Sequence, residues 1–92
     1  MGNWSGAEKS YVKAVELLDR ASVQDIDQDF ASLLNKLGTV RLWQKDFAGA
    51  ETSHRRALTI YRKTRGADDL RVADTLDLVA VALFEQPHGH EL

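Results

Sequence analysis

The stretch Phe47-Ala48-Gly49-Ala50-Glu51 decides the fold, because it repeats an earlier stretch of the same chain, Trp4-Ser5-Gly6-Ala7-Glu8, at an offset of 43 residues. The match continues downstream, where Ala14 corresponds to Ala57. An internal period of this length is typical of repeat proteins, in which each unit buries its apolar face only by stacking on a neighbour. The repeat therefore predicts an interaction scaffold, and it does not identify the partner.

A second repeated stretch is interleaved with the first. Residues 31–38 (Ala-Ser-Leu-Leu-Asn-Lys-Leu-Gly) match residues 73–80 (Ala-Asp-Thr-Leu-Asp-Leu-Val-Ala) at an offset of 42 residues. Two interleaved matches with nearly the same period mean that the chain alternates between two kinds of segment. Each kind occurs twice, so we expect two copies of a two-segment unit.

Hydrophobic periodicity predicts that all four segments are helices and gives no strand signal. Their expected bounds are about Ser5–Ala21, from a cap at Asp25 or Asp27 to a break at Lys45-Asp46, about Phe47–Arg65, and about Leu70–Gln86. Between the last two helices, Gly66 is the expected C-cap and Asp68 or Asp69 the expected N-cap. The whole chain is predicted to form one domain at residues 1–86, with a flexible tail at residues 87–92.

Each helix carries one apolar stripe, and these stripes predict the core. Their members are Ala7, Tyr11, Ala14, Leu17 and Leu18; Phe30, Leu33, Leu34, Leu37, Val40 and Leu42; Ala50, His54, Ala57, Leu58, Ile60 and Tyr61; and Val72, Leu76, Val79, Leu83 and Phe84. Gly38 stands in mid-helix, where glycine costs about 1 kcal/mol relative to alanine. We expect close packing of the second and third helices at Gly38 to compensate, and we expect His54 to be a packing residue with one hydrogen bond.

Composition excludes several classes of function. The chain has no cysteine, so neither disulfides nor thiolate chemistry are available, which fits a cytoplasmic location. No apolar run approaches the roughly 18 residues that cross a bilayer, and the net charge of −2 gives no general attraction to nucleic acid. We therefore expect neither a membrane nor a nucleic acid as partner.

Charge is unevenly distributed along the chain. Residues 41–65 carry seven bases against Asp46 and Glu51, a net charge of +5, whereas residues 66–92 carry six acids against Arg71, a net charge of −5. One interpretation is that these are solvated helix faces. The other is that they are complementary ends of a stack, or a basic patch for an acidic partner segment.

No motif predicts catalysis, a cofactor or a metal. The chain lacks a phosphate-binding glycine loop, a cysteine nucleophile and a helical His-x-x-x-His pair. His88, His90 and Glu91 belong to the expected tail and are a weak metal candidate. Asp25, Asp27 and Asp29 alternate as in a calcium loop, but the glycine and the distal glutamate of such a loop are missing.

The pattern Leu34-x-x-Leu37-Gly38, followed by Asp46-Phe47-x-x-Ala50 and then Ala57, resembles a tetratricopeptide repeat. The 42-residue period is similar to that of the kinesin-light-chain-like subclass rather than to the 34-residue form. The resemblance covers about residues 3–86 and implies an all-α fold, with antiparallel helix hairpins stacked as a short right-handed solenoid of four helices in B–A–B–A order. Arg41 and His54 stand where the family prefers an aromatic residue.

The resemblance further implies a protein–protein interaction module that binds a peptide or helix of a partner along the concave face of its A helices. By position within the repeat, that face would show Ser32, Asn35, Thr39, Trp43, Asp74, Asp77, Val81 and Glu85. The family's carboxylate clamp for acidic tails needs basic residues at positions that here hold Asn35, Thr39, Asp77 and Val81. The acidic surface would instead favour a basic or neutral peptide.

Two other functions stay open. In the B–A–B–A order, the first helix lacks a preceding A helix and the last lacks a following B helix. Self-association through these two helices is the second hypothesis, and a two-fold dimer is preferred over a head-to-tail stack because closed pairs are the commoner outcome. The third hypothesis is a segment that senses a peptide or ligand within a larger regulator.

Overall fold

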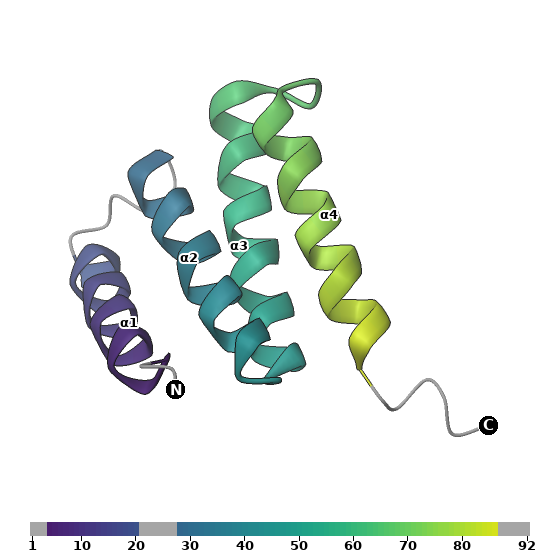
Figure 1. Ribbon diagram of the computed structural model, residues 1–92. Coiled ribbons are helices and arrows are strands. Elements are labelled where there is room, and N and C mark those ends of the chain that lie inside the picture. Colours follow the sequence, from purple (N-terminus) through teal and green to yellow (C-terminus); the bar gives the residue numbers. More distant parts are fainter. Residues whose placement is uncertain (1–3, 21–27, 87–92) are drawn as a thin grey trace.

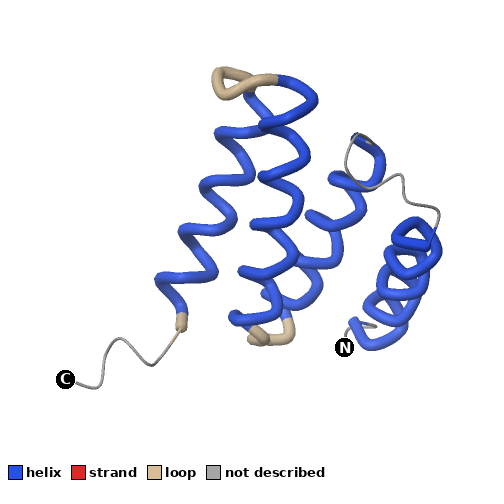
Figure 2. The backbone as a smooth tube through the Cα atoms, turned by 180° about the vertical axis from the view of Figure 1, so that it is seen from behind, coloured by secondary structure: helices blue, strands red, loops and turns tan. Residues whose placement is uncertain are grey.

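The computed structural model describes residues 4–20 and 28–86, without the side chains of Trp4, Ser5, Leu18 and Gln28. This part of the chain forms the helices α1 (Trp4–Arg20), α2 (Gln28–Trp43), α3 (Phe47–Arg65) and α4 (Leu70–Glu85), and it contains no strand. Figure 1 shows the helices in a row in chain order, each antiparallel to the next, and Figure 2 shows the row from behind. The predicted all-α stack of helices is confirmed, and α1 and α4 lie at its two ends.

The predicted helix boundaries follow from capping side chains. At the start of α3, Asp46 Oδ1 accepts a hydrogen bond from the Gly49 amide at 3.0 Å, and at the start of α4, Asp69 Oδ1 accepts one from the Arg71 amide at 2.8 Å. Each carboxylate satisfies an amide that has no partner within its own helix. Gly66 ends α3 with a φ of 90°. The caps expected at Asp25 or Asp27 and the tail expected at residues 87–92 lie outside the described residues.

A lysine occupies the left-handed position of the turn between α2 and α3. Lys45 has a φ of 66°, and its amide donates to the Leu42 carbonyl at 2.9 Å. The next amide, that of Asp46, donates to the Arg41 carbonyl at 2.8 Å. This pair of bonds is the Schellman pattern, in which glycine usually occupies the left-handed residue.

Lys45→Gly should therefore stabilise the fold. A left-handed conformation costs an L-residue roughly 1–2 kcal/mol, and part of this gain is lost because glycine has more freedom in the unfolded chain. We expect a net increase in the free energy of unfolding of about 0.5–1 kcal/mol, measured by urea denaturation. Gln44→Gly, one residue earlier, is the matched control and should destabilise. A Lys45→Gly variant no more stable than the parent would contradict the strain at this turn.

The core lies between the helices and agrees with the predicted stripes of α2 and α3. All six residues predicted to face inward on α3 are buried, together with Phe30, Leu34, Leu37 and Val40 of α2. The prediction for α4 is partly wrong, because Leu76, Leu83 and Phe84 are exposed while Thr75 and Ala82 are buried. The physical reason is position: α4 ends the row, so only the side of it that meets α2 and α3 is covered. Leu17 of α1, at the other end, is also exposed.

Close packing at Gly38 is confirmed. A Cβ atom added there would lie 2.6 Å from Cε1 and Nε2 of the buried His54 ring. The imidazole of α3 thus occupies the space that any side chain of α2 would need at this position. Glycine is required here because of this contact, and its cost to the helix is offset by the packing.

Two arginines hold α1 against its neighbours. Arg41 Nε donates to Glu8 Oε2 at 3.1 Å, and Arg56 Nη2 donates to Asp19 Oδ1 at 2.6 Å. Arg41 Nη1 also reaches Ser53 Oγ at 3.4 Å, so the residue that replaces the family's aromatic joins α1, α2 and α3. The four charged side chains are partly exposed, so each pair contributes roughly 0.2–1 kcal/mol to stability.

Within the described segments, no helix combines the length and the apolar character that crossing a bilayer requires.

Candidate functional site

One face of α2 forms the floor of a cleft of about 370 Å³, here called the α2 cleft. Its lining comes from three helices and consists of Tyr11, Ser32, Asn35, Lys36, Thr39, Val40, Trp43 and Tyr61. The α2 residues among them recur at three- and four-residue spacing, which places them on one side of the helix. The lining combines hydroxyl, amide and ammonium groups with aromatic rings, so it can form hydrogen bonds and apolar contacts with the same ligand.

A second cleft of about 260 Å³, the end pocket, lies where α2 turns into α3 and faces the end of α4. It is lined by Leu42, Trp43, Lys45, Phe47, Val81 and Glu85. Four of these side chains are apolar, while Lys45 and Glu85 supply one charge of each sign. Trp43 lines both clefts, and 64% of its surface is exposed. This tryptophan therefore joins the two clefts.

The residues assigned to the concave face are distributed over these two clefts. Ser32, Asn35, Thr39 and Trp43 all line the α2 cleft, and Trp43, Val81 and Glu85 line the end pocket. Asp74 and Asp77 are exposed on α4 and line neither of these clefts.

Sequence reasoning missed several residues that line the clefts. Tyr11 and Tyr61 were assigned to the apolar core, yet both line the α2 cleft. Tyr61 is buried, forms a hydrogen bond with Ser32, and has its pKa raised chiefly by burial. The signal that could have identified it is the phenol itself, since a tyrosine in an apolar stripe often buries its ring and presents its hydroxyl at a surface.

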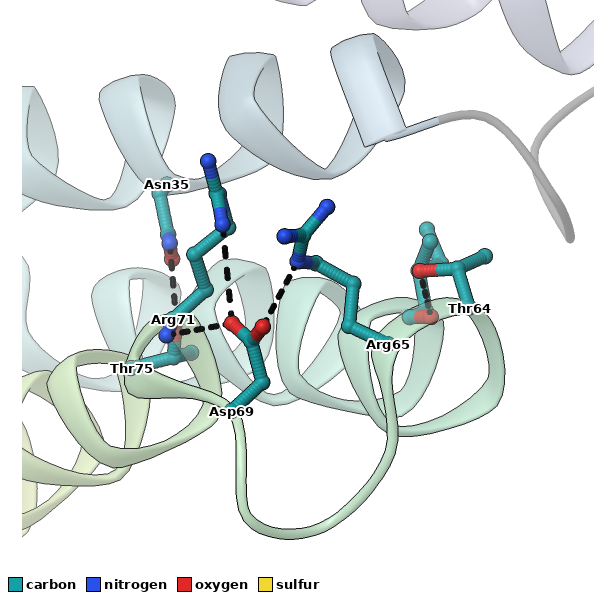
Figure 3. A network of polar contacts seen from close by, with 7 residues as sticks. Asn35, Thr64, Arg65, Asp69, Arg71 and Thr75 are labelled. Atoms are coloured by element: carbon teal, nitrogen blue, oxygen red, sulfur yellow. Dashed lines mark hydrogen bonds and ion pairs between the residues drawn. The ribbon is translucent and has the colours of Figure 1, made fainter.

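A chain of hydrogen-bonded side chains links α3, α2 and α4, and its middle member, Asn35, lines the α2 cleft. His54 Nδ1 lies 2.8 Å from Asn35 Oδ1, and Asn35 Nδ2 donates to Thr75 Oγ1 at 3.0 Å. The second of these bonds is drawn in Figure 3. Asn35 thus has one donor and one acceptor engaged within the fold, and a second amide hydrogen and a second lone pair remain for a ligand.

His54 is neutral in the folded protein. The side chain is fully buried, and this burial lowers its pKa to about 4. Because Asn35 Oδ1 can only accept, Nδ1 of His54 carries the proton, and Nε2 is left as a buried acceptor with no hydrogen-bond partner in the described structure. A protonated ring would need an acceptor at both nitrogens, so this environment disfavours the charge. The expectation of a packing histidine with one hydrogen bond is confirmed.

A cluster of one carboxylate and two guanidinium groups lies at the α3–α4 loop. The Asp69 carboxylate accepts hydrogen bonds from the Arg71 amide and from Arg65 Nε, the latter at 2.9 Å (Figure 3). Arg71 Nη1 lies 3.6 Å from Asp69 Oδ1. The amide of Arg71 first, and then the Arg65 side chain, lower the pKa of this carboxyl. These contacts cap α4 and close the loop. Among the described residues, no group of three or more His, Asp or Glu side chains is arranged to hold a metal ion.

Comparison with known sequences identifies one family. A family model described as tetratricopeptide repeat matches residues 29–90, about two thirds of the chain. Neither the curated proteins nor the solved structures contain a match to this chain. The matched range includes α3, α4 and all of α2 except its first residue, and therefore the lining of both clefts apart from Tyr11.

Proposed function

The chain belongs to the tetratricopeptide repeat family, and on this basis we propose that it binds one extended peptide of a partner protein along the α2 cleft and into the end pocket. Repeats of this family generally mediate protein–protein interactions. The observation that carries the proposal is the largely exposed Trp43 shared by the two clefts. Tryptophan is enriched among the residues that contribute most to binding energy at protein interfaces.

Within the family, we propose the long-period, kinesin-light-chain-like subclass. Support comes from sequence matches between α2 and α4 at positions 42 residues apart. Gly38 and Ala80 are both small, and Asn35 and Asp77 both stand three residues before them on an A helix. The 42-residue period is accommodated by long helices, since α3 extends over 19 residues.

The two clefts together define the chemistry of the peptide. The end pocket suits one bulky apolar side chain, and the hydroxyl and amide groups of the α2 cleft suit the backbone of an extended segment. Glu85 lines the end pocket, while Asp74 and Asp77 are exposed on the same helix. A peptide with an apolar anchor followed by neutral or basic residues is therefore favoured over an acidic one.

Selection from a random peptide library displayed on phage tests this proposal. We expect enriched peptides to share a bulky apolar residue beside a basic one, and to bind Trp43→Ala at least roughly ten-fold more weakly than the parent, because an aromatic anchor contributes about 2 kcal/mol or more. Arg62→Ala, on the exposed side of α3, is the matched control and should bind as the parent does. Loss of binding confined to Arg62→Ala, or no enrichment at all, would contradict the proposal.

Self-association is a second candidate function, and the exposed apolar residues of α4 favour it. Leu76, Leu83 and Phe84 form part of one side of this helix and are 42%, 42% and 74% exposed. Leaving such side chains in water costs roughly 1.5–3 kcal/mol each relative to full burial. A symmetric dimer is the closed form of such an assembly, and a head-to-tail stack is its open form.

A further inference from the structure

One side of α4 is apolar and exposed along its whole length. We call it the exposed α4 face, and it consists of Ala73, Leu76, Ala80, Leu83 and Phe84. Their spacing of three and four residues places them on one stripe of the helix. The stripe lies beside the buried stripe of Val72, Thr75, Val79 and Ala82, which faces the rest of the molecule.

The same surface exists a second time in the chain, and there it is covered. The five residues that lie 42 positions earlier in the sequence, on α2, are Ala31, Leu34, Gly38, Arg41 and Leu42. The first three of these are buried, and the last two are half-buried. Gly38 lies directly beneath the His54 ring of α3. The chain therefore contains its own example of what covers this surface, namely a helix of the α3 type.

The sequence counterpart of α3 is α1, at an offset of 43 residues. Three positions define how α3 meets α2: His54 lies over Gly38 and hydrogen-bonds Asn35. The corresponding residues are Tyr11 on α1, and Ala80 and Asp77 on α4. The substitutions are chemically matched, because a tyrosine O–H donates well to a carboxylate and alanine is the next smallest residue after glycine.

We propose that α1 of a second copy of this chain covers the exposed α4 face, so that copies stack head to tail. In the stack, the Tyr11 ring lies over Ala80 of the neighbouring copy and its O–H donates to Asp77. The exposure of α1 within one chain supports the proposed stack. Leu17 is 56% exposed, whereas its counterpart on α3, Ile60, is buried. Figures 1 and 2 place α1 and α4 at opposite ends of the row, which is the arrangement that an open stack requires. The inference rests on the self-association candidate.

Disulfide trapping tests the register of the stack, because the chain contains no cysteine. The two single-cysteine variants Tyr11→Cys and Ala80→Cys are prepared separately, mixed and exposed to a mild oxidant. We expect a disulfide between the two different variants and little product from either variant alone, because only the mixed pair brings the two cysteines within bonding range. Lys63→Cys mixed with Ala80→Cys is the control and should give no more than the background of random collision.

Two results would overturn the head-to-tail stack. Rapid dimerisation of Ala80→Cys with itself would indicate a two-fold pairing of α4 faces. Trapping of the mixed pair no faster than the Lys63→Cys control would show that α1 and α4 of different copies do not meet in this register.

Sedimentation analysis gives an independent measure without cysteine. We expect the average mass of the parent to rise with concentration above that of one 10.3 kDa chain. Leu83→Asp, a change at an exposed position, should keep the chain folded and at the mass of one copy. Tyr11→Phe retains the ring and should weaken association roughly ten-fold through loss of one charge-assisted hydrogen bond.

A folded parent that keeps the mass of one chain at all concentrations would overturn the stack. Peptide binding by Leu83→Asp separates the two proposals, because Leu83 lines neither cleft. A monomeric variant that still binds the selected peptides would leave the proposed function intact.

Discussion

Replacing Gly38 by leucine should lower the free energy of unfolding by roughly 3 kcal/mol, the upper end of the usual cost of overpacking a core. The cause is the His54 ring, whose atoms lie 2.6 Å from the position of the new Cβ. The ring is fully buried and hydrogen-bonded to Asn35, so it cannot yield without disturbing α2 or α3. Thermal and urea unfolding followed by circular dichroism measure the effect. An unchanged midpoint would refute the pairing of these helices.

A double-mutant cycle isolates the contact itself. Gly38→Ala alone should destabilise, although alanine favours helix by about 1 kcal/mol over glycine. In a His54→Ala background the ring is absent, and the same Gly38→Ala change should then stabilise by about 1 kcal/mol. The sign of the effect therefore reverses between the two backgrounds. The same sign in both would mean that the imidazole is not what restricts position 38.

Acid should weaken the fold through His54. The pKa of this histidine falls from 6.5 to about 4 on folding, so between these values the unfolded chain binds a proton that the folded chain does not. Stability from this group is complete above pH 6.5 and is lost progressively as the pH falls to about 4. A lowering of the pKa by this amount corresponds to a loss of about 3 kcal/mol in the free energy of unfolding.

The acid effect is measured as the difference between the parent and His54→Gln, each unfolded by urea from neutral pH to about pH 4. The subtraction removes the contributions of groups common to both chains. Their difference in stability should narrow as the pH falls. In the parent, the assigned His54 ring resonance should show no protonation until the pH approaches 4. A ring that titrates near 6.5 in the folded protein would contradict its burial as a neutral group.

The helices and their ends could be predicted from the sequence because their causes are local. Asp46, Gly66 and Asp69 cap helices through atoms no more than four residues away. The core of α3 was also predictable, since a helix between two others is covered on both sides. Exposure on α4 was not, because an apolar stripe specifies what should be buried and does not say whether a covering helix is present.

The candidate site was predicted in part, for a similar reason. Repeat position placed four α2 residues on one face, and all four line the α2 cleft. Repeat position did not predict that Tyr11 and Tyr61 line the same cleft, because their place in it depends on how α1 and α3 pack against α2. Thr75 was missed as a buried partner of Asn35, because a hydrogen bond between positions 40 residues apart leaves no local sequence signal.

The polar chain from His54 through Asn35 to Thr75 also bears on the order in which the helices open. Repeat arrays tend to fray from their ends, because each unit contacts only its neighbours. Detaching α4 would break the bond from Asn35 to Thr75, next to the bond that His54 donates to the same amide. Among the described residues, α1 is joined to α2 and α3 by ion pairs between partly exposed side chains. Amide hydrogens of α1 should therefore exchange with solvent faster than those of α2, α3 and α4, and these three helices should exchange as one cooperative unit.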